Sequence, residues 1–344
     1  MGRLSAHLYF LTHAKSLISG VKAQRAVAKI TFLKLLEGLK LDEFLKTPRT
    51  KKEIMEKIGE VKDTDLFNTF YNVLVKHFCK KMPGERIVLD EKRIKKIREI
   101  ESTIIGEQFK PIITAASTVF PRVLKALFKK EEPRFTWAEI STTYYAQLKA
   151  PIYFYGRESV FRFANVKKYL KGKSLFIAGC GYGYEVEHVL KYLDGNIRIY
   201  AGDFFEEVID IAKAHEFEFK GRRVALGELD NVDFILLDPE FKKPWDIEDE
   251  TFDGVMAFAV IHWVKDQRKF IQEVARILVP GGLFFGATPL YKDHPDDIDV
   301  LFLKLQGGNR QLSIKEFYEY MEEAGFHKID ILGKAAFKAF KKVA

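Results

Sequence analysis

The chain has 344 residues, of which 47% are hydrophobic and 30% charged, as in ordinary folded proteins. At about 100–200 residues per domain, this length suggests about two domains. No apolar run approaches the roughly 18 residues of a membrane-spanning helix, and the N-terminus has no signal-peptide pattern. We therefore expect a cytoplasmic protein with no membrane partner. Two cysteines, Cys79 and Cys180, are too few for a disulfide framework or a cysteine zinc site.

The net charge of +8 is unevenly distributed along the chain. Residues 1–173 hold 35 Lys and Arg against 18 Asp and Glu, whereas residues 174–344 hold 21 against 30. Such asymmetry is typical of a polyanion-binding module joined to another domain. The alternative is a solvated, lysine-rich helical surface, because composition does not say where charges point. The scarcity of Asn and Gln beside abundant Lys and Glu further suggests a thermophilic source.

Helical patterns dominate the first half of the chain. Apolar residues recur at helical spacing, and Thr50 and Glu53 form a capping-box pattern ahead of a short helix that Gly59 ends. The predicted helices are 23–45, 51–58 and 63–80, followed by a short strand at 86–89. Three helices and a hairpin are the parts of a winged helix. We therefore predict a winged-helix-like domain over residues 1–150, serving substrate recognition or dimerisation.

Aromatic and basic residues alternate between positions 144 and 168. This pattern suits a surface that follows phosphates and stacks bases. The alternative is a core helix with aromatic packing. The candidate substrate residues in this stretch are Tyr153, Phe154, Tyr155 and Arg157.

The second half alternates short apolar strands with helices, which implies a parallel sheet. The predicted strands are 174–178, 197–201, 233–237, 254–259 and 282–286. Ligands of such sheets bind at the carboxyl ends of the strands. The second domain is expected to span residues 151–344.

The strand ends carry the residues with the clearest chemical meaning. The first strand runs into Gly179, Gly181 and Gly183, spaced G-x-G-x-G and not in the dinucleotide pattern G-x-G-x-x-G. The second strand ends at Asp203, whose carboxylate could accept hydrogen bonds from both hydroxyls of a ribose. The third ends at Asp238, next to Pro239.

With these ordered motifs, residues 174–332 resemble the class I S-adenosylmethionine-dependent methyltransferases. The resemblance implies an α/β fold with a seven-stranded Rossmann-like sheet of order 3-2-1-4-5-7-6. It also implies S-adenosylmethionine as cofactor, with the glycines facing its methionine part, Asp203 on the ribose and Asp238 on the adenine amino group. The implied cofactor-binding residues are Gly179, Cys180, Gly181, Gly183, Asp203, Phe204, Asp238 and Ala259. Pro239 departs from the family, because it has no N–H to donate to the base.

The N-terminal part resembles the winged-helix region that many small-molecule O-methyltransferases place before this domain. In those enzymes a histidine acts as base, which points to His262 as the catalytic residue. Trp263 and Tyr291 are further candidate substrate residues. No carboxylate or histidine cluster has metal-ligand spacing, so no metal is predicted.

Two classes of acceptor remain open. The first is an RNA base, such as an exocyclic amino nitrogen of ribosomal RNA, which the basic first half and the aromatic stretch favour. The second is a small molecule methylated on oxygen or nitrogen by a homodimer, which the N-terminal resemblance favours. A cofactor-binding regulator with a winged helix for DNA is a third hypothesis.

Overall fold

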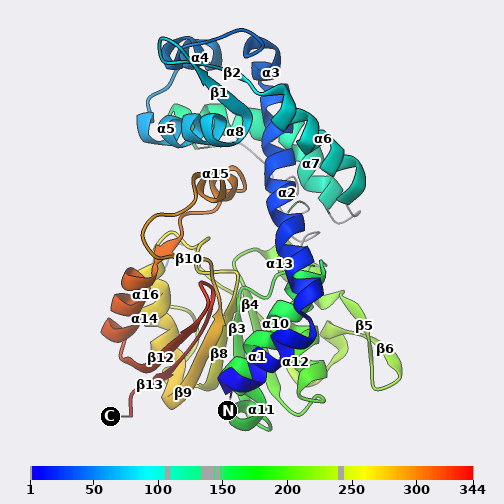
Figure 1. Ribbon diagram of the computed structural model, residues 1–344. Helices are drawn as coiled ribbons and strands as arrows, with labels where there is room; N and C mark the ends of the chain where they lie inside the picture. The colour runs from blue at the N-terminus through cyan, green and yellow to red at the C-terminus, as the bar shows by residue number, and fades with distance from the viewer. Residues whose placement is uncertain are drawn as a thin grey trace. The chain divides into compact units, whose positions relative to one another are not determined.

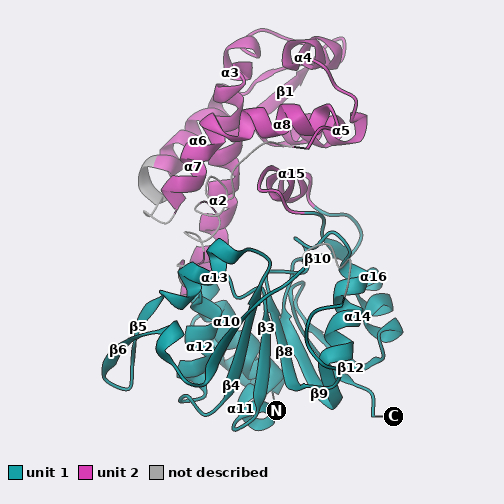
Figure 2. Ribbon diagram, turned by 180° about the vertical axis from the view of Figure 1, so that it is seen from behind, with its two compact units in different colours: residues 1–14, 153–295, 309–344 teal, residues 15–152, 296–308 magenta. Residues whose placement is uncertain are grey.

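The computed structural model describes residues 2–104, 109–132, 143, 148, 150–238 and 244–343. The chain forms two compact units, each built from separate segments (Figure 2). Unit 1 comprises residues 1–14, 153–295 and 309–344, and unit 2 comprises residues 15–152 and 296–308. The main break lies near the predicted boundary at residue 150, but the units exchange two segments. Residues 1–14 belong with the C-terminal half, and residues 296–308 with the helical half.

Unit 1 is built on a seven-stranded sheet with the order β12-β13-β9-β8-β3-β4-β7. Its strands are β3 (Ser174–Ala178), β4 (Arg198–Asp203), β7 (Val232–Leu236), β8 (Phe252–Phe258), β9 (Leu278–Ala287), β12 (Phe326–Leu332) and β13 (Ala336–Lys341). Numbered within the sheet, this is the order 3-2-1-4-5-7-6 that the family resemblance implied. Neighbouring strands are parallel, except that β13 runs antiparallel to both β9 and β12. The α/β fold prediction is confirmed.

Helices cover both faces of this sheet (Figure 1). One face packs against α10 (Pro151–Ala164), α11 (Val166–Leu170), α12 (Tyr184–Tyr192) and α13 (Glu206–Lys213). The other face packs against α14 (Gln267–Ile277) and α16 (Ile314–Glu323). In α14 the buried residues Phe270, Ile271 and Val274 form the apolar stripe that faces the sheet, and Asp266 caps the helix.

Smaller elements complete unit 1. They are α1 (Gly2–Thr12), the hairpin of β5 (Glu216–Phe219) and β6 (Arg222–Ala225), the short 3₁₀ helix η3 (Leu226–Glu228), β10 (Leu290–Tyr291) and β11 (Leu312–Ser313). The N-terminal helix is joined to β12 through Arg3, whose Nε donates to Asp330 at 3.0 Å. Strands β10 and β11 form a parallel pair. They lie in the sequence before and after residues 296–308, the segment that belongs to unit 2.

Unit 2 is mainly helical. Its helices are α2 (Ala14–Gly38), α3 (Leu41–Phe44), α4 (Lys51–Ile58), α5 (Thr64–Val73), the π-helix η1 (Leu74–Phe78), α6 (Glu91–Ile104), α7 (Lys110–Thr118), α8 (Phe120–Phe128) and α15 (Asp297–Leu305). Their core is aromatic, with Phe32, Phe67, Phe70, Phe78 and Phe128 in mutual ring contact.

The predicted helix 51–58 is confirmed, together with the residues predicted to begin and end it. The side chain of Thr50 accepts from the Glu53 N–H, Glu53 accepts from the Thr50 N–H at 2.8 Å, and Gly59 ends the helix. The predicted third helix begins as expected, since Asp63 caps α5, but its last turn is a π-helix. The hairpin strands β1 (Cys79–Met82) and β2 (Arg86–Leu89) follow. The parts of a winged helix are thus present, and their assembly into that motif stays a prediction.

Among the described residues, no single helix has both the length and the hydropathy of a membrane span. Helices α7 and α8 meet these criteria only when taken together, across a bend of 53°.

Candidate cofactor-binding site

The loop between β3 and α12 requires glycine at two positions. Gly179 has φ +77°, and a Cβ there would lie 2.4 Å from the side chain of Val260. Gly183 has φ +88° and is the residue preceding the first turn of α12, where a Cβ would lie 2.5 Å from Leu226. Both positions are in the left-handed region that only glycine adopts without strain. The loop therefore lies directly against the turn that follows β8.

Asp203, the last residue of β4, ties this loop to the sheet. Its Oδ2 accepts from the N–H of Gly181 at 2.9 Å, and its Oδ1 accepts from the N–H of Phe204 at 2.8 Å. The backbone oxygen of Gly202 accepts from both Gly179 and Cys180 at 2.8 Å. A carboxylate has about four lone-pair sites, and the backbone N–H groups of Gly181, Phe204 and Phe205 all bond this one, so at least one site remains for a ribose hydroxyl.

Burial sets the ionisation of this group. Asp203 is only 5% exposed, and burial raises its pKa to about 6, against the lowering effect of the backbone N–H groups that bond it. The neighbouring carboxylate of Glu185 raises it further. Cys180 is also buried beside these acids, and its thiol pKa lies well above the usual value. Cys180 is therefore an unreactive, packed thiol.

The other predicted cofactor residues lie at the same edge of the sheet. The N–H of Leu237 donates to the backbone oxygen of Asp203 at 2.8 Å, which brings the half-buried Asp238 beside that strand end. Phe204 is half-buried and packs against the hydrophobic core. Ala259, just after β8, has φ +57°, a strained conformation for a residue with a side chain. Pro239, the departure from the family pattern, lies outside the described residues.

The turn that carries His262 is clamped by two side-chain amides. Gln267 donates from Nε2 to the backbone oxygens of Ile261 and Arg310, at 2.9 and 2.8 Å. Asn309 donates from Nδ2 to Val264 and from its backbone N–H to the oxygen of His262. These hydrogen bonds hold the turn in place. Sequence analysis missed both amides, because they act on backbone atoms across as many as 45 residues.

His262 itself is 8% exposed. Its Nδ1 lies 3.2 Å from Oγ1 of Thr288, at the end of β9. Burial lowers the pKa of His262 to about 3, so the imidazole is neutral at every pH near neutrality. The Thr288 contact fixes the orientation of the ring. A neutral, fixed imidazole can accept a hydrogen bond but is a weak base.

The predicted substrate residues have varied surroundings. Phe154 is 51% exposed, whereas Tyr153 and Tyr155 are half-buried. Arg157 is 3% exposed and forms an ion pair with Glu185. Trp263 is half-buried beside His262, with ring centroids 5.8 Å apart. Tyr291 in β10 is half-buried, and its hydroxyl lies 3.5 Å from Glu316.

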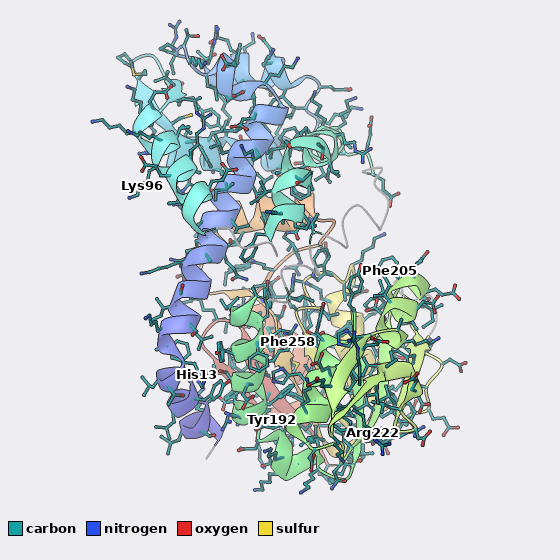
Figure 3. All side chains as sticks on the ribbon, turned by 90° about the vertical axis from the view of Figure 1, so that its right-hand side faces the viewer. His13, Lys96, Tyr192, Phe205, Arg222 and Phe258 are labelled. Atoms are coloured by element: carbon teal, nitrogen blue, oxygen red, sulfur yellow. The ribbon has the colours of Figure 1, made fainter. Side chains whose placement is uncertain are left out.

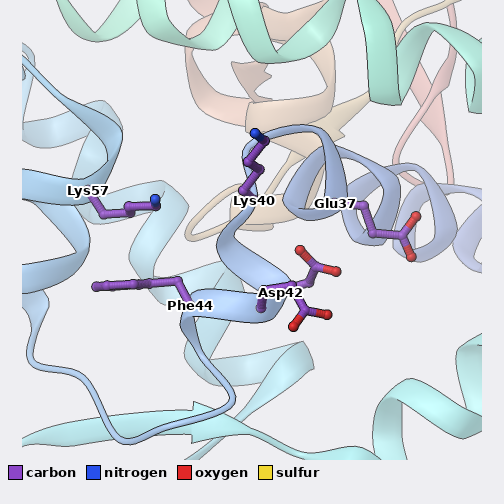
Figure 4. Close-up of a pocket in the computed structure, with 6 residues that line it drawn as sticks. Glu37, Lys40, Asp42, Phe44 and Lys57 are labelled. Atoms are coloured by element: carbon purple, nitrogen blue, oxygen red, sulfur yellow. The ribbon is translucent and has the colours of Figure 1, made fainter.

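Unit 2 has a pocket that contains none of the predicted cofactor-binding residues. It is lined by Glu37, Lys40, Asp42, Glu43, Phe44 and Lys57 (Figure 4). These residues mix both signs of charge, and Arg98 pairs with Glu37. Within the described ranges no group of three or more His, Cys, Asp and Glu side chains is placed to hold a metal.

Comparison with known proteins shows the family of this domain. A family model described as a methyltransferase domain matches residues 177–286, which include the glycine loop, Asp203 and His262. The chain carries a class I S-adenosylmethionine-dependent methyltransferase domain. The family resemblance and its cofactor are thereby confirmed, and the residues of the site fit that cofactor, since Asp203 is buried, tied in place and aligned with the glycine loop.

Two curated relatives each match about half of this chain. A probable S-adenosylmethionine-dependent methyltransferase of Mycolicibacterium smegmatis is 28% identical over 162 residues, which is 47% of this chain and 55% of the relative. An uncharacterized methyltransferase of Schizosaccharomyces pombe is 24% identical over 184 residues, covering 50% of this chain and 60% of the relative. The matches thus span little more than half the length of either relative.

Two solved structures share the fold of the whole chain. The DszA carbon methyltransferase superposes with a TM-score of 0.66 at 17% identity, over 99% of this chain and 94% of that one. The carbon methyltransferase (CMeT) domain of the citrinin polyketide synthase has a TM-score of 0.67 at 12% identity, over 100% and 96%. Because both cover the helical unit as well as the methyltransferase domain, the likeness in fold is not confined to the sheet.

Replacing Asp203 by alanine should weaken S-adenosylmethionine binding by about 10- to 100-fold, since a charged hydrogen-bond acceptor for the ribose is lost. Isothermal titration calorimetry measures this. The control is Asp210→Ala, which removes an exposed acid of α13. Wild-type affinity in the Asp203 variant would refute the assignment.

The affinity for S-adenosylmethionine should also depend on pH. The pKa of Asp203 is about 6, so the carboxylate is ionised above pH 6 and protonated below it. The cofactor carries positive charge and donates hydroxyl hydrogen bonds, so its dissociation constant should rise by up to about tenfold per pH unit below pH 6. Titrations between pH 5 and 8 test this, and a dissociation constant that stays flat across the range would contradict it.

Proposed function

We propose that the protein is a methyltransferase that transfers the methyl group of S-adenosylmethionine to a small organic acceptor with an acidic proton. The observation that carries this proposal is the clamped, neutral His262 at the end of β8, next to the residues that fit the donor. A methyl sulfonium needs mainly alignment of the acceptor and exclusion of water.

When bound, the cofactor would supply an electrophilic methyl group. The bond between this methyl group and sulfur breaks, and its electron pair stays on the sulfur. His262 orients the acceptor by accepting a hydrogen bond from it and receives the proton as the new bond to the methyl group forms. A ring whose pKa is about 3 takes protons readily only from acidic groups. An enol fits this requirement, because its O–H proton becomes strongly acidic as the enol carbon takes the methyl group.

The likeness to two carbon methyltransferases supports this proposal. Both proteins are named as carbon methyltransferases, and the common fold extends over both units of this chain. At 17% and 12% identity these structures show the fold alone, so the acceptor rests on the chemistry of the His262 turn.

An RNA base is the second candidate, and the positive charge favours it. The positive net charge is less concentrated when it is counted by structural unit than when it is counted by half of the sequence. Unit 2 holds 29 Lys and Arg against 20 Asp and Glu, and unit 1 holds 27 against 28. In the aromatic and basic stretch, Arg157 is buried, Arg162 pairs with Glu158 and Lys168 lies over the ring of Tyr169. These contacts support helix packing more than a phosphate-binding surface.

Replacing His262 by alanine should lower kcat by about 100-fold or more, while leaving the affinity for S-adenosylmethionine unchanged. His188→Ala is the matched control, because that histidine is equally buried, at 8% exposure, but pairs with Glu158 on α10. In the wild type, kcat should show no histidine titration between pH 5 and 8. Full activity of the His262 variant would show that His262 is not a catalytic residue.

The acceptor class is tested by incubating the protein with methyl-labelled S-adenosylmethionine and three fractions: total RNA, ribosomes and a small-molecule extract. Label should enter the small-molecule fraction, at a carbon attached to an acidifying group. Label in RNA, together with RNA affinity that falls steeply with salt, would establish the second candidate instead.

A further inference from the structure

The N-terminal helix α1 has the reverse of the usual distribution of side chains. Its small residues Gly2 and Ala6 are buried. Its large apolar residues Leu4, Leu8 and Leu11 are 65%, 55% and 68% exposed. These leucines follow the spacing i, i+4, i+7, so they lie on one face of the helix. In an ordinary surface helix such a face would point toward the core.

Other side chains of α1 hold the helix on unit 1 in this orientation. The Nη2 of Arg3 donates to the backbone oxygen of Ile331 in β12 at 2.9 Å. A Cβ on Gly2 would lie 2.4 Å from the backbone oxygen of Phe163, so the first turn packs closely against the end of α10. These contacts leave the leucine face pointing outward. Exposed apolar side chains that gather on one face mark an interaction surface, whereas scattered single ones do not.

A group of lysines lies beside the first turn of α1. A Cβ on Gly2 would lie 2.6 Å from the side-chain nitrogen of Asn165, the residue that precedes α11. Helix α11 and the turn that follows it carry three exposed cations, Lys167, Lys168 and Lys171. The ammonium of Lys167 lies 4.8 Å from the ring centroid of Tyr192, which is labelled in Figure 3. Unit 1 thus presents an apolar helix face and a group of cations next to each other.

The charge around α1 is positive. The sequence has no Asp or Glu before Glu37. Two acids of unit 1 act on α1, and each has a cationic partner. Asp330 accepts from Arg3 at 3.0 Å. Glu158 accepts from Nε of Arg162 at 3.1 Å. An apolar face bordered by such positive charge is complementary to a partner that combines negative charge with an apolar interior.

A lipid surface fits these features better than a second copy of the chain. Two copies would bring the same cations together, and α1 has no acid to offset them. The leucines cover only about two turns, which is short of the three or four heptads of a coiled coil. An anionic bilayer meets both features, because its acyl chains receive the leucines and its phosphates attract the lysines. Fluid lipid also needs no shaped pocket on the convex face of a helix.

We propose that α1 and α11 form a docking surface for the anionic headgroup region of a lipid bilayer. Leu4, Leu8 and Leu11 enter the boundary between headgroups and acyl chains, and the lysines of α11 contact lipid phosphates. A helix bound in this way lies in the plane of the interface and does not span the membrane. The expectation of no membrane partner rested on the lack of a spanning segment, and this proposal departs from it. It does not depend on the acceptor of the methyl group.

The test measures sedimentation of the full chain with lipid vesicles. Vesicles of mixed phosphatidylglycerol and phosphatidylcholine should bind the wild type at least about tenfold more strongly than phosphatidylcholine alone, and added salt should weaken this binding. Replacing Leu4, Leu8 and Leu11 together by serine should weaken binding by about tenfold or more. The matched control replaces Ile211 and Val343, two exposed apolar residues elsewhere in unit 1, by serine, and should bind like the wild type.

A second pair of variants tests the charge. Lys167→Gln combined with Lys168→Gln should weaken binding to the mixed vesicles by about tenfold. Lys95→Gln combined with Lys96→Gln removes the same charge from exposed positions of α6, where Lys96 is labelled in Figure 3, and should bind like the wild type. All variants should keep the wild-type affinity for S-adenosylmethionine, so a loss of vesicle binding is distinguished from unfolding and from a failure of the proposed function.

Absence of wild-type binding to the mixed vesicles, or equal binding to both kinds of vesicle, would overturn the proposal. A concentration-dependent dimer that the triple serine variant cannot form would assign the leucine face to a second copy instead. Leucine-dependent binding to polyglutamate without binding to vesicles would assign it to an acidic protein, which also contradicts the proposal. If the triple variant does not fold, Leu8→Ser alone should still weaken vesicle binding by about two- to threefold, and unchanged binding would refute the role of the leucines.

Discussion

The burial of one carboxylate, that of Asp203, constrains much of unit 1. A buried carboxylate is tolerated when N–H groups surround it, and here Gly181 and Phe204 supply them. To present the N–H of Gly181 to Asp203, the loop after β3 must turn back sharply, which requires a left-handed backbone at Gly179. The absence of a side chain at Gly179 then lets Val260 approach, and the turn after β8 is placed beside the loop. The glycine loop and the turn that carries His262 are therefore brought together by the same contact.

Features that depend on a few adjacent residues could be predicted from the sequence. The capping box of Thr50 and Glu53, the cap at Asp63 and the carboxylate at the end of β4 are all local signals. The order of the seven strands could not be worked out from periodicity, because apolar runs do not say which strands are neighbours. It came from the family resemblance, which the sheet bears out.

Long-range contacts could not be predicted in this way. The N-terminal helix belongs with the sheet because Arg3 meets Asp330, a pair separated by 327 residues. Likewise, α15 leaves the second half of the chain to join unit 2, where Asp296 lies 3.4 Å from Lys76. The last turn of the third helix is a π-helix, a form for which the apolar spacing gives no signal. Each case depends on partners that only the folded chain brings together.

The alternation of aromatic and basic residues after position 150 shows why a surface cannot be inferred from composition alone. On α10, the side of the helix that faces the sheet carries Arg157 into the interior, where a carboxylate and an aromatic ring surround it. Five residues further along, Arg162 lies over Tyr9 of the N-terminal helix and bonds Glu158. The same composition that would suit a phosphate-tracking surface thus provides internal partners for its own cations. Because Arg157 is buried and paired with Glu185, its guanidinium is not displayed at the surface for phosphates to bind.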